Sequence, residues 1–144
     1  MRPVTAEQII NHRALAHLTE ERRQYILEVS HGFGGDHPFK AQSCFANAQR
    51  LALHDKKERI TYVEGLMAIS WNDVHHAWNK IDGVEFDVTE PFLLAEVQHR
   101  LGEDVPRDTL LLFVLKAGRH DPFFSQHYLW DRHLVALRGF FQAT

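Results

Sequence analysis

The stretch HHAWNKIDGVEFDVT, residues 75–89, contains the strongest turn signal of this 144-residue sequence. Asp82-Gly83 is a dipeptide typical of a two-residue β-hairpin turn, because both of its residues tolerate a positive φ angle. The sequence therefore predicts two short strands, over 75–81 and 84–89, joined by this turn.

The predicted turn also fixes which side chains share a face of the sheet. With Ile81 opposite Val84, the residues on one face of the hairpin are His76, Trp78, Asp87 and Thr89. His76 and Asp87 are then diagonal neighbours on adjacent strands, within reach of each other's side chains. A carboxylate bound to one ring nitrogen of His76 would fix the tautomer and leave the other nitrogen free. His75 points to the opposite face, so the register predicts that Asp87 pairs with His76 and not with His75.

The whole pattern predicts an α+β fold, with a small antiparallel sheet packed on a cysteine-bearing helix and with flanking N- and C-terminal helices. The expected elements outside the hairpin are helical residues over 5–29, 44–54 and 123–141, a strand over 60–69, and a strand or a helix over 109–117. A further helix is expected to open at Glu90-Pro91 and to end at Gly102. The candidate N-caps are Thr5, Thr19 and Ser43, and only Thr5 begins a capping box. No repeat or linker divides residues 1–144, so we expect one domain.

The composition excludes several classes of protein. The chain has 16 Lys and Arg against 19 Asp and Glu, a formal charge of −3, which argues against binding to nucleic acids or to anionic membranes. A single cysteine excludes an intrachain disulfide and a cysteine-rich zinc finger. The longest strongly apolar run, Leu110 to Leu115, is too short for a membrane helix, and no secretory signal is visible. We therefore expect a cytoplasmic protein whose free thiol stays reduced.

That lone cysteine, Cys44, falls at the predicted start of a helix. Unpaired backbone N–H groups and the helix dipole at this position favour a thiolate over a thiol. A thiolate that faces an oriented imidazole is the arrangement of a cysteine nucleophile, and the same N–H groups can bind the oxyanion of an acyl intermediate. The sequence therefore predicts that Cys44 is a nucleophile if its helix points at the hairpin.

Four short motifs carry a resemblance to a known family. In chain order they are Cys44-Phe45-Ala46-Asn47-Ala48, Tyr62-Val63-Glu64-Gly65, His76-Ala77-Trp78-Asn79 and Asp87-Val88-Thr89. Their order resembles the transglutaminase-like branch of the papain-like cysteine enzymes, over about residues 42–89, a third of the chain. The resemblance implies a triad of Cys44 as nucleophile, His76 as general base and Asp87 as orienting group. Such families include proteases, amidases, acyltransferases and cross-linking transglutaminases.

The chain departs from that family around the cysteine. Gln42-Ser43 stands where a glycine or tryptophan usually precedes the nucleophile, and the spacings between the motifs are compact. Gln42 is a candidate oxyanion donor, although backbone N–H groups suit that role better. Asn47 is a candidate for the oxyanion or substrate-binding site, or else ties down a neighbouring loop. Trp78 either shields the triad from water or belongs to the core, and Glu64 is assigned no chemistry.

The sequence supports one principal function and leaves two alternatives open. The principal expectation is a cysteine hydrolase or acyltransferase that needs no cofactor and acts on a peptide, a protein or a small acyl or amide substrate through an acyl-Cys44 intermediate. One alternative is an inactive member of the same fold that binds a protein partner through exposed aromatic residues. The candidates for that surface are Phe123-Phe124, Trp130 and Phe140-Phe141.

The other alternative is metal-dependent hydrolysis by some of the 11 histidines. No two of these histidines are three or four residues apart, the spacing of a helical zinc site. A site from distant segments would combine His120-Asp121 with His31 or His37. No metal ligand is therefore assigned from the sequence.

Overall fold

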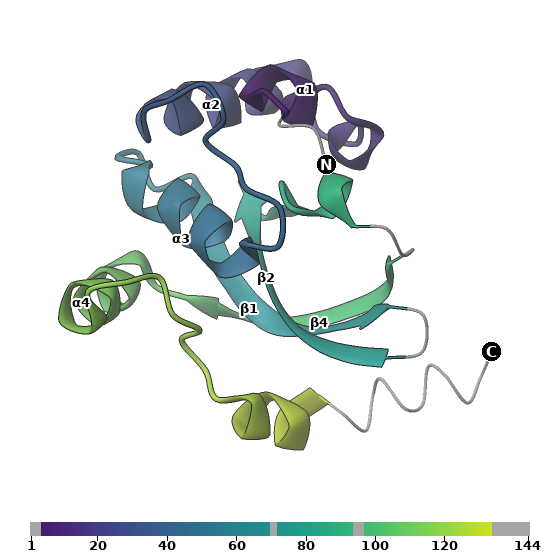
Figure 1. Ribbon diagram of the computed structural model, residues 1–144, viewed down its shortest axis with the longest axis vertical. Coiled ribbons are helices and arrows are strands. Elements are labelled where there is room, and N and C mark those ends of the chain that lie inside the picture. Colours follow the sequence, from purple (N-terminus) through teal and green to yellow (C-terminus); the bar gives the residue numbers. More distant parts are fainter. Residues whose placement is uncertain (1–3, 70–71, 94–96, 134–144) are drawn as a thin grey trace.

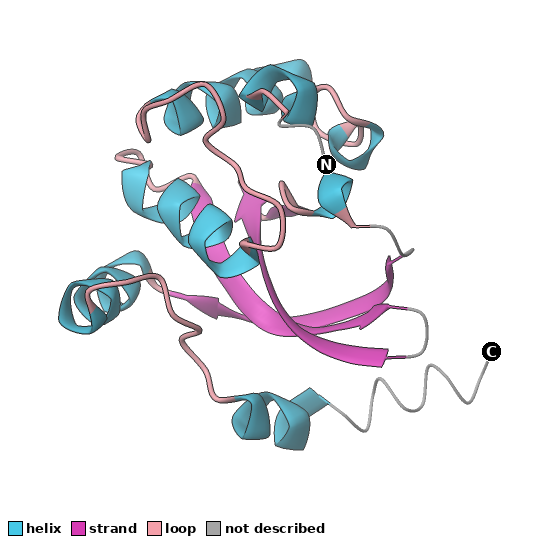
Figure 2. Ribbon diagram, in the orientation of Figure 1, coloured by secondary structure: helices cyan, strands magenta, loops and turns pink. Residues whose placement is uncertain are grey.

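The computed structural model describes residues 4–69, 72–93 and 97–133, which fold as α+β (Figure 1). A four-stranded antiparallel sheet with strand order β3-β2-β1-β4 forms the centre, and helices lie against it (Figure 2). The strands are β1 (Ile60–Ile69), β2 (Asn72–Ile81), β3 (Val84–Phe86) and β4 (Val97–Val105). The helices are α1 (Ala6–Ile10), α2 (Glu20–His31), α3 (Cys44–His54) and α4 (Arg107–Ala117), with 3₁₀ turns η1 (Arg13–Leu15) and η2 (Glu90–Phe92).

The hairpin between β2 and β3 has the predicted turn and register. Asp82 and Gly83 both have positive φ angles, 51° and 83°, and Ile81 pairs with Val84. These angles match the turn whose twist suits two antiparallel strands. The strand β3 ends at Phe86, earlier than predicted, so Asp87 follows the paired part of the strand.

The N-terminal region contains more breaks than its apolar pattern indicates. The predicted helical stretch over 5–29 is divided into α1, the turn η1 and α2. Thr5 and Gln8 form the expected capping box, and Thr19 accepts a hydrogen bond from the backbone of Arg22 at the start of α2. The apolar side chains of α1 and α2 pack with Leu51 of α3 and with apolar residues on both sides of the hairpin turn in the largest core cluster.

Helix α3 has the predicted bounds and lies across β1 and β2 (Figure 1). Small side chains at Ala48 and Ala52 allow it to pack closely on Tyr62 and Ala77 of the sheet. The amide of Asn79 on β2 donates to the backbone oxygen of Ala48 at 2.9 Å. This buried hydrogen bond ties the middle of α3 to the strand that carries His76.

The helix expected from Glu90-Pro91 to Gly102 is wrong. In the described part of this stretch, residues 90–93 contain the single turn η2 and residues from Val97 onward belong to β4, where Gly102 pairs with Gly65 of β1. A Cβ atom at Gly102 would lie 2.7 Å from the Trp78 ring, so this glycine serves close packing across the sheet rather than a helix end. Pairing with a distant strand overrides the local helix signals.

The C-terminal elements complete the fold. The ambiguous segment 109–117 belongs to the helix α4, and residues 126–133 are also helical. The remainder of the helix predicted over 123–141 lies outside the described residues. Among the described helices, none is long and apolar enough to cross a membrane.

We expect the substitution Gly102→Ala to destabilise the fold by about 1–3 kcal/mol, because the added methyl group overpacks the contact with Trp78 and Val63. Urea unfolding followed by tryptophan fluorescence measures the change. Asp104→Ala, two residues along β4 at an exposed ion pair with Lys80, is the control and should cost less than about 1 kcal/mol. An unchanged stability of Gly102→Ala would contradict this account of the glycine.

Candidate active site

Cys44 is the first residue of α3 and is partly exposed. Ser43 precedes it as N-cap, but its side chain makes no capping hydrogen bond. The first N–H groups of an α-helix have no acceptor within the helix, so those of α3 are available to a ligand beside the Cys44 sulfur. The expected position of Cys44 at a helix start is confirmed.

His76 and Asp87 form a buried pair at the same end of α3. The Nε2 atom of His76 lies 2.7 Å from Oδ2 of Asp87, and both side chains are almost completely buried. The other carboxylate oxygen accepts the backbone N–H groups of Thr89 at 2.8 Å and Glu90 at 3.1 Å. The carboxylate is thus fixed by the turn after β3, and the Nδ1 atom of His76 remains for another partner.

The charges in this pair favour a protonated imidazole. Burial lowers the pKa of His76, but the hydrogen bond and charge of Asp87, together with the nearby Cys44 side chain, outweigh it and raise the pKa to about 9. Burial raises the pKa of Asp87, yet the hydrogen bond and charge of His76, the charge of Arg100 and the Thr89 N–H hold it below its usual value. Cys44 is therefore close enough to act on the imidazole electrostatically.

Trp78 lies beside this pair as the hairpin register predicts. Its ring is stacked on that of His76, with centroids 6.0 Å apart and planes inclined by 21°. Trp78 is almost fully buried, and its Nε1 atom has no hydrogen-bond partner among the described residues. The ring thus excludes water from one side of the imidazole and also belongs to the packed interior.

The other two sequence candidates have different environments. The Asn47 amide is buried and donates to the Lys40 backbone oxygen at 2.9 Å and to the Thr89 hydroxyl at 2.8 Å. Both donors are used, so Asn47 ties the loop before α3 to the segment after Asp87. Gln42 has a left-handed φ of 60°, and no hydrogen bond of its side chain is found within the described residues.

Glu64, to which the sequence assigned no chemistry, is a buried structural centre. Its carboxylate accepts the Tyr62 hydroxyl at 2.5 Å, a His75 ring nitrogen at 2.9 Å, and the backbone N–H groups of Phe123 and Phe124, each at 2.6 Å. A Glu within an otherwise apolar strand is the signal that could have indicated a buried, fully bonded carboxylate. Glu64 fastens the segment after α4 to the sheet.

His75 has a separate environment from His76. It binds Glu64 and packs edge-on against Phe45, with ring centroids 5.0 Å apart. The Asp87 carboxylate thus pairs with one of these two adjacent histidines, as the hairpin register predicts.

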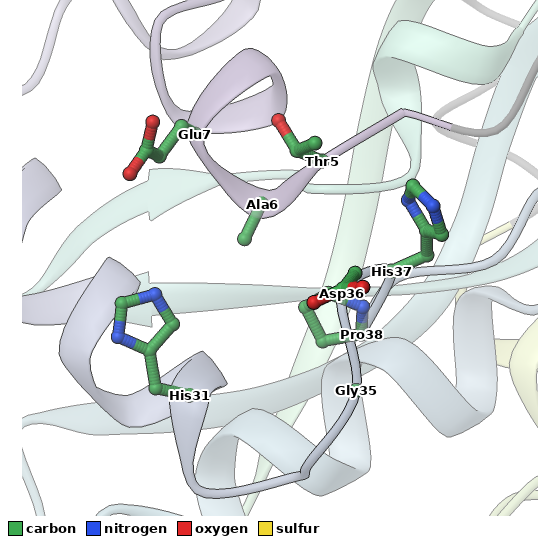
Figure 3. A pocket seen from close by; sticks show the side chains of 8 residues that line it. All are labelled: Thr5, Ala6, Glu7, His31, Gly35, Asp36, His37 and Pro38. Carbon is green, nitrogen blue, oxygen red and sulfur yellow. The ribbon is translucent and has the colours of Figure 1, made fainter.

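The histidines considered for a metal site do not come together. Within the described ranges, no group of three or more His, Cys, Asp and Glu side chains could hold a metal ion. His120 binds Gln49, whereas His31 and His37 line a surface hollow of about 510 Å³ with Glu7 and Asp36. The side chains that line this hollow do not converge on one point (Figure 3).

Comparisons with known proteins give no relative for this chain: no family model, no curated protein and no solved structure matches it.

The raised pKa of His76 predicts a pH-dependent contribution to stability. Because the folded chain binds this proton more tightly than the unfolded chain, the contribution is complete below the unfolded pKa of about 6.5 and is lost as the pH rises through about 9. Asp87→Asn removes the charge that holds the proton. We expect the stability advantage of the wild type over Asp87→Asn to shrink between pH 6.5 and 9.5.

Urea unfolding of both proteins at half-unit pH intervals measures this difference. Asp82→Asn, which alters an exposed ion pair at the far end of the hairpin, is the control and should show no such trend in this pH range. A constant difference between the wild type and Asp87→Asn would contradict a strong His76–Asp87 ion pair.

Proposed function

We propose that this protein is a cysteine hydrolase or acyltransferase of the peptidase, amidase or transglutaminase-like kind, acting through an acyl-Cys44 intermediate. The observation that carries the proposal is the group of three side chains at the start of α3. Asp87 holds one ring nitrogen of His76 at 2.7 Å in a buried pair, and the Cys44 side chain is near enough to help raise the pKa of that imidazole. Nucleophile, base and orienting group are then in the order that such chemistry requires.

The first half of the reaction transfers the acyl group to the enzyme. In the resting enzyme the proton of the Cys44 thiol is held by His76, the form that the Asp87 carboxylate favours, and the sulfur attacks the carbonyl carbon of an amide, ester or thioester. Free N–H groups in the first turn of α3 stabilise the oxyanion that forms. The bond to the leaving group then breaks, the His76 imidazolium donates its proton to that group, and an acyl thioester remains on Cys44.

The second half returns the enzyme to its starting state. Water or an amine loses a proton to His76 and attacks the thioester carbon, and the bond to the Cys44 sulfur breaks. Asp87 stabilises the imidazolium in both halves, as a buried carboxylate of this geometry does in other triads. We place this reaction in the cytoplasm, without a cofactor, on a peptide, a protein or a small acyl or amide substrate.

A second candidate function, protein binding, is favoured by a different observation. Leu112 and Leu115 lie one turn apart on α4 and are each 69% exposed, and Tyr128 and Trp130 are also exposed. Exposed apolar side chains on one helix are typical of a binding surface. The sedimentation coefficient tests whether this face binds a second copy of the chain. If it does, the wild type should sediment as a dimer and the double variant Leu112→Lys, Leu115→Lys as a monomer.

The reactivity of Cys44 tests the proposed enzyme without knowledge of its substrate. Cys44 is the single cysteine, so iodoacetamide reports on this thiol alone. A free thiol with a pKa of about 8.5 is about one hundredth ionised at pH 6.5. With His76 as proton acceptor, we expect the folded wild type to react about tenfold or more faster than the urea-unfolded chain at this pH. His76→Ala should lose that advantage, and Asp87→Asn should keep part of it.

His75→Gln is the matched control, because Gln can still donate a hydrogen bond to Glu64 and the neighbouring histidine stays in place. It should react like the wild type. Mass spectrometry after incubation with p-nitrophenyl acetate should find an acetyl group on Cys44 in the wild type and none in Cys44→Ala. Equal alkylation rates for the folded and unfolded wild type, with no acetyl enzyme, would refute the proposed function.

A further inference from the structure

Arg100 reaches the buried His76–Asp87 pair from the opposite edge strand, β4. Its Nη1 atom lies 3.4 Å from Oδ2 of Asp87, the same oxygen that binds His76, and 3.5 Å from Oε2 of Glu90. Its guanidinium carbon also lies 5.6 Å from the centre of the Trp78 ring. One arginine therefore touches both acidic side chains and the aromatic ring around the imidazole.

The four contacts of Asp87 divide its carboxylate into two halves. One oxygen is fixed by the backbone of Thr89 and Glu90, so the position of Asp87 does not depend on Arg100. The other oxygen is shared by the imidazole of His76 and the guanidinium of Arg100. Because the side chain of Asp87 is 1% exposed, solvent and salt screen this sharing only weakly.

We propose that Arg100 is a positioning residue of the Cys44 site, which acts through Asp87 and Glu90 to limit the negative charge that His76 faces. The inference rests on the proposed function, because the negative charge that faces His76 affects catalysis only if this imidazole transfers protons. An imidazolium held by an uncompensated Asp87 carboxylate, with a second carboxylate, Glu90, in the same cluster, would protonate a leaving group poorly. With Arg100 in place, His76 is oriented by Asp87 yet still releases its proton.

The charged and titratable groups around His76 come from several elements. Asp87 and Glu90 follow β3, Arg100 is on β4, Cys44 begins α3, and His12 in the N-terminal segment acts on Glu90. Burial raises the pKa of Glu90, and the charge of Arg100 opposes that rise. Removal of Arg100 leaves Asp87 in place through its backbone bonds but takes away the guanidinium that shares its Oδ2 atom with His76.

The test compares Arg100→Met and Arg100→Lys with the wild type. Methionine keeps an apolar stem against Trp78, and lysine keeps the charge. Arg59→Met is a matched control, because Arg59 also contacts two carboxylates, those of Glu21 and Asp82, and covers an aromatic ring. The measurement is the NMR titration of the His76 ring from pH 5 to pH 10.5.

For Arg100→Met we expect the His76 titration to move upward by about half a pH unit. Arg100→Lys should stay near the wild type, and Arg59→Met should not move at all. An unmoved His76 titration in Arg100→Met, or a downward shift as in Asp87→Asn, would overturn the proposal. Because the NMR titration needs no reactive thiol, it decides the role of Arg100 even if Cys44 reacts like an unfolded thiol and the proposed function fails.

Discussion

The register of the β2–β3 hairpin is the constraint on which the candidate site depends. Side chains alternate along a strand, so a slip of one residue would move every side chain of β2 to the other face. His76 would then lose Asp87. The turn at Asp82-Gly83 prevents this slip, because positive φ angles at both positions fix two-residue pairing between Ile81 and Val84.

The buried carboxylates of Glu64 and Asp87 are held in different ways. Glu64 is satisfied by two backbone N–H groups, a phenol and a ring nitrogen of His75, and these contacts join the sheet to the segment after α4. Asp87 has two backbone N–H groups, an imidazole and the nearby guanidinium of Arg100. The first arrangement fixes a chain segment, whereas the second leaves its imidazole with a free nitrogen.

The groups around Cys44 come from parts of the chain that are far apart in sequence. Asn47 joins the loop before α3 to Thr89, just after Asp87. Asn79 ties the same helix to the middle of β2. Polar side chains in the interior thus set the position of the helix start relative to the histidine strand, while the alanines of α3 permit the close approach.

The sequence by itself determined the elements whose signals are local. The Asp82-Gly83 turn, the bounds of α3 and β1, and the Thr5 capping box depend on residues within a few positions of one another. Only the tertiary structure decided that the residues before Gly102 form a strand, that Glu64 is buried, and that Arg100 reaches Asp87. These features depend on strands and segments that are distant in sequence. Hydrogen bonds and burial between such segments produce no hydrophobic periodicity that a local stretch of sequence could reveal.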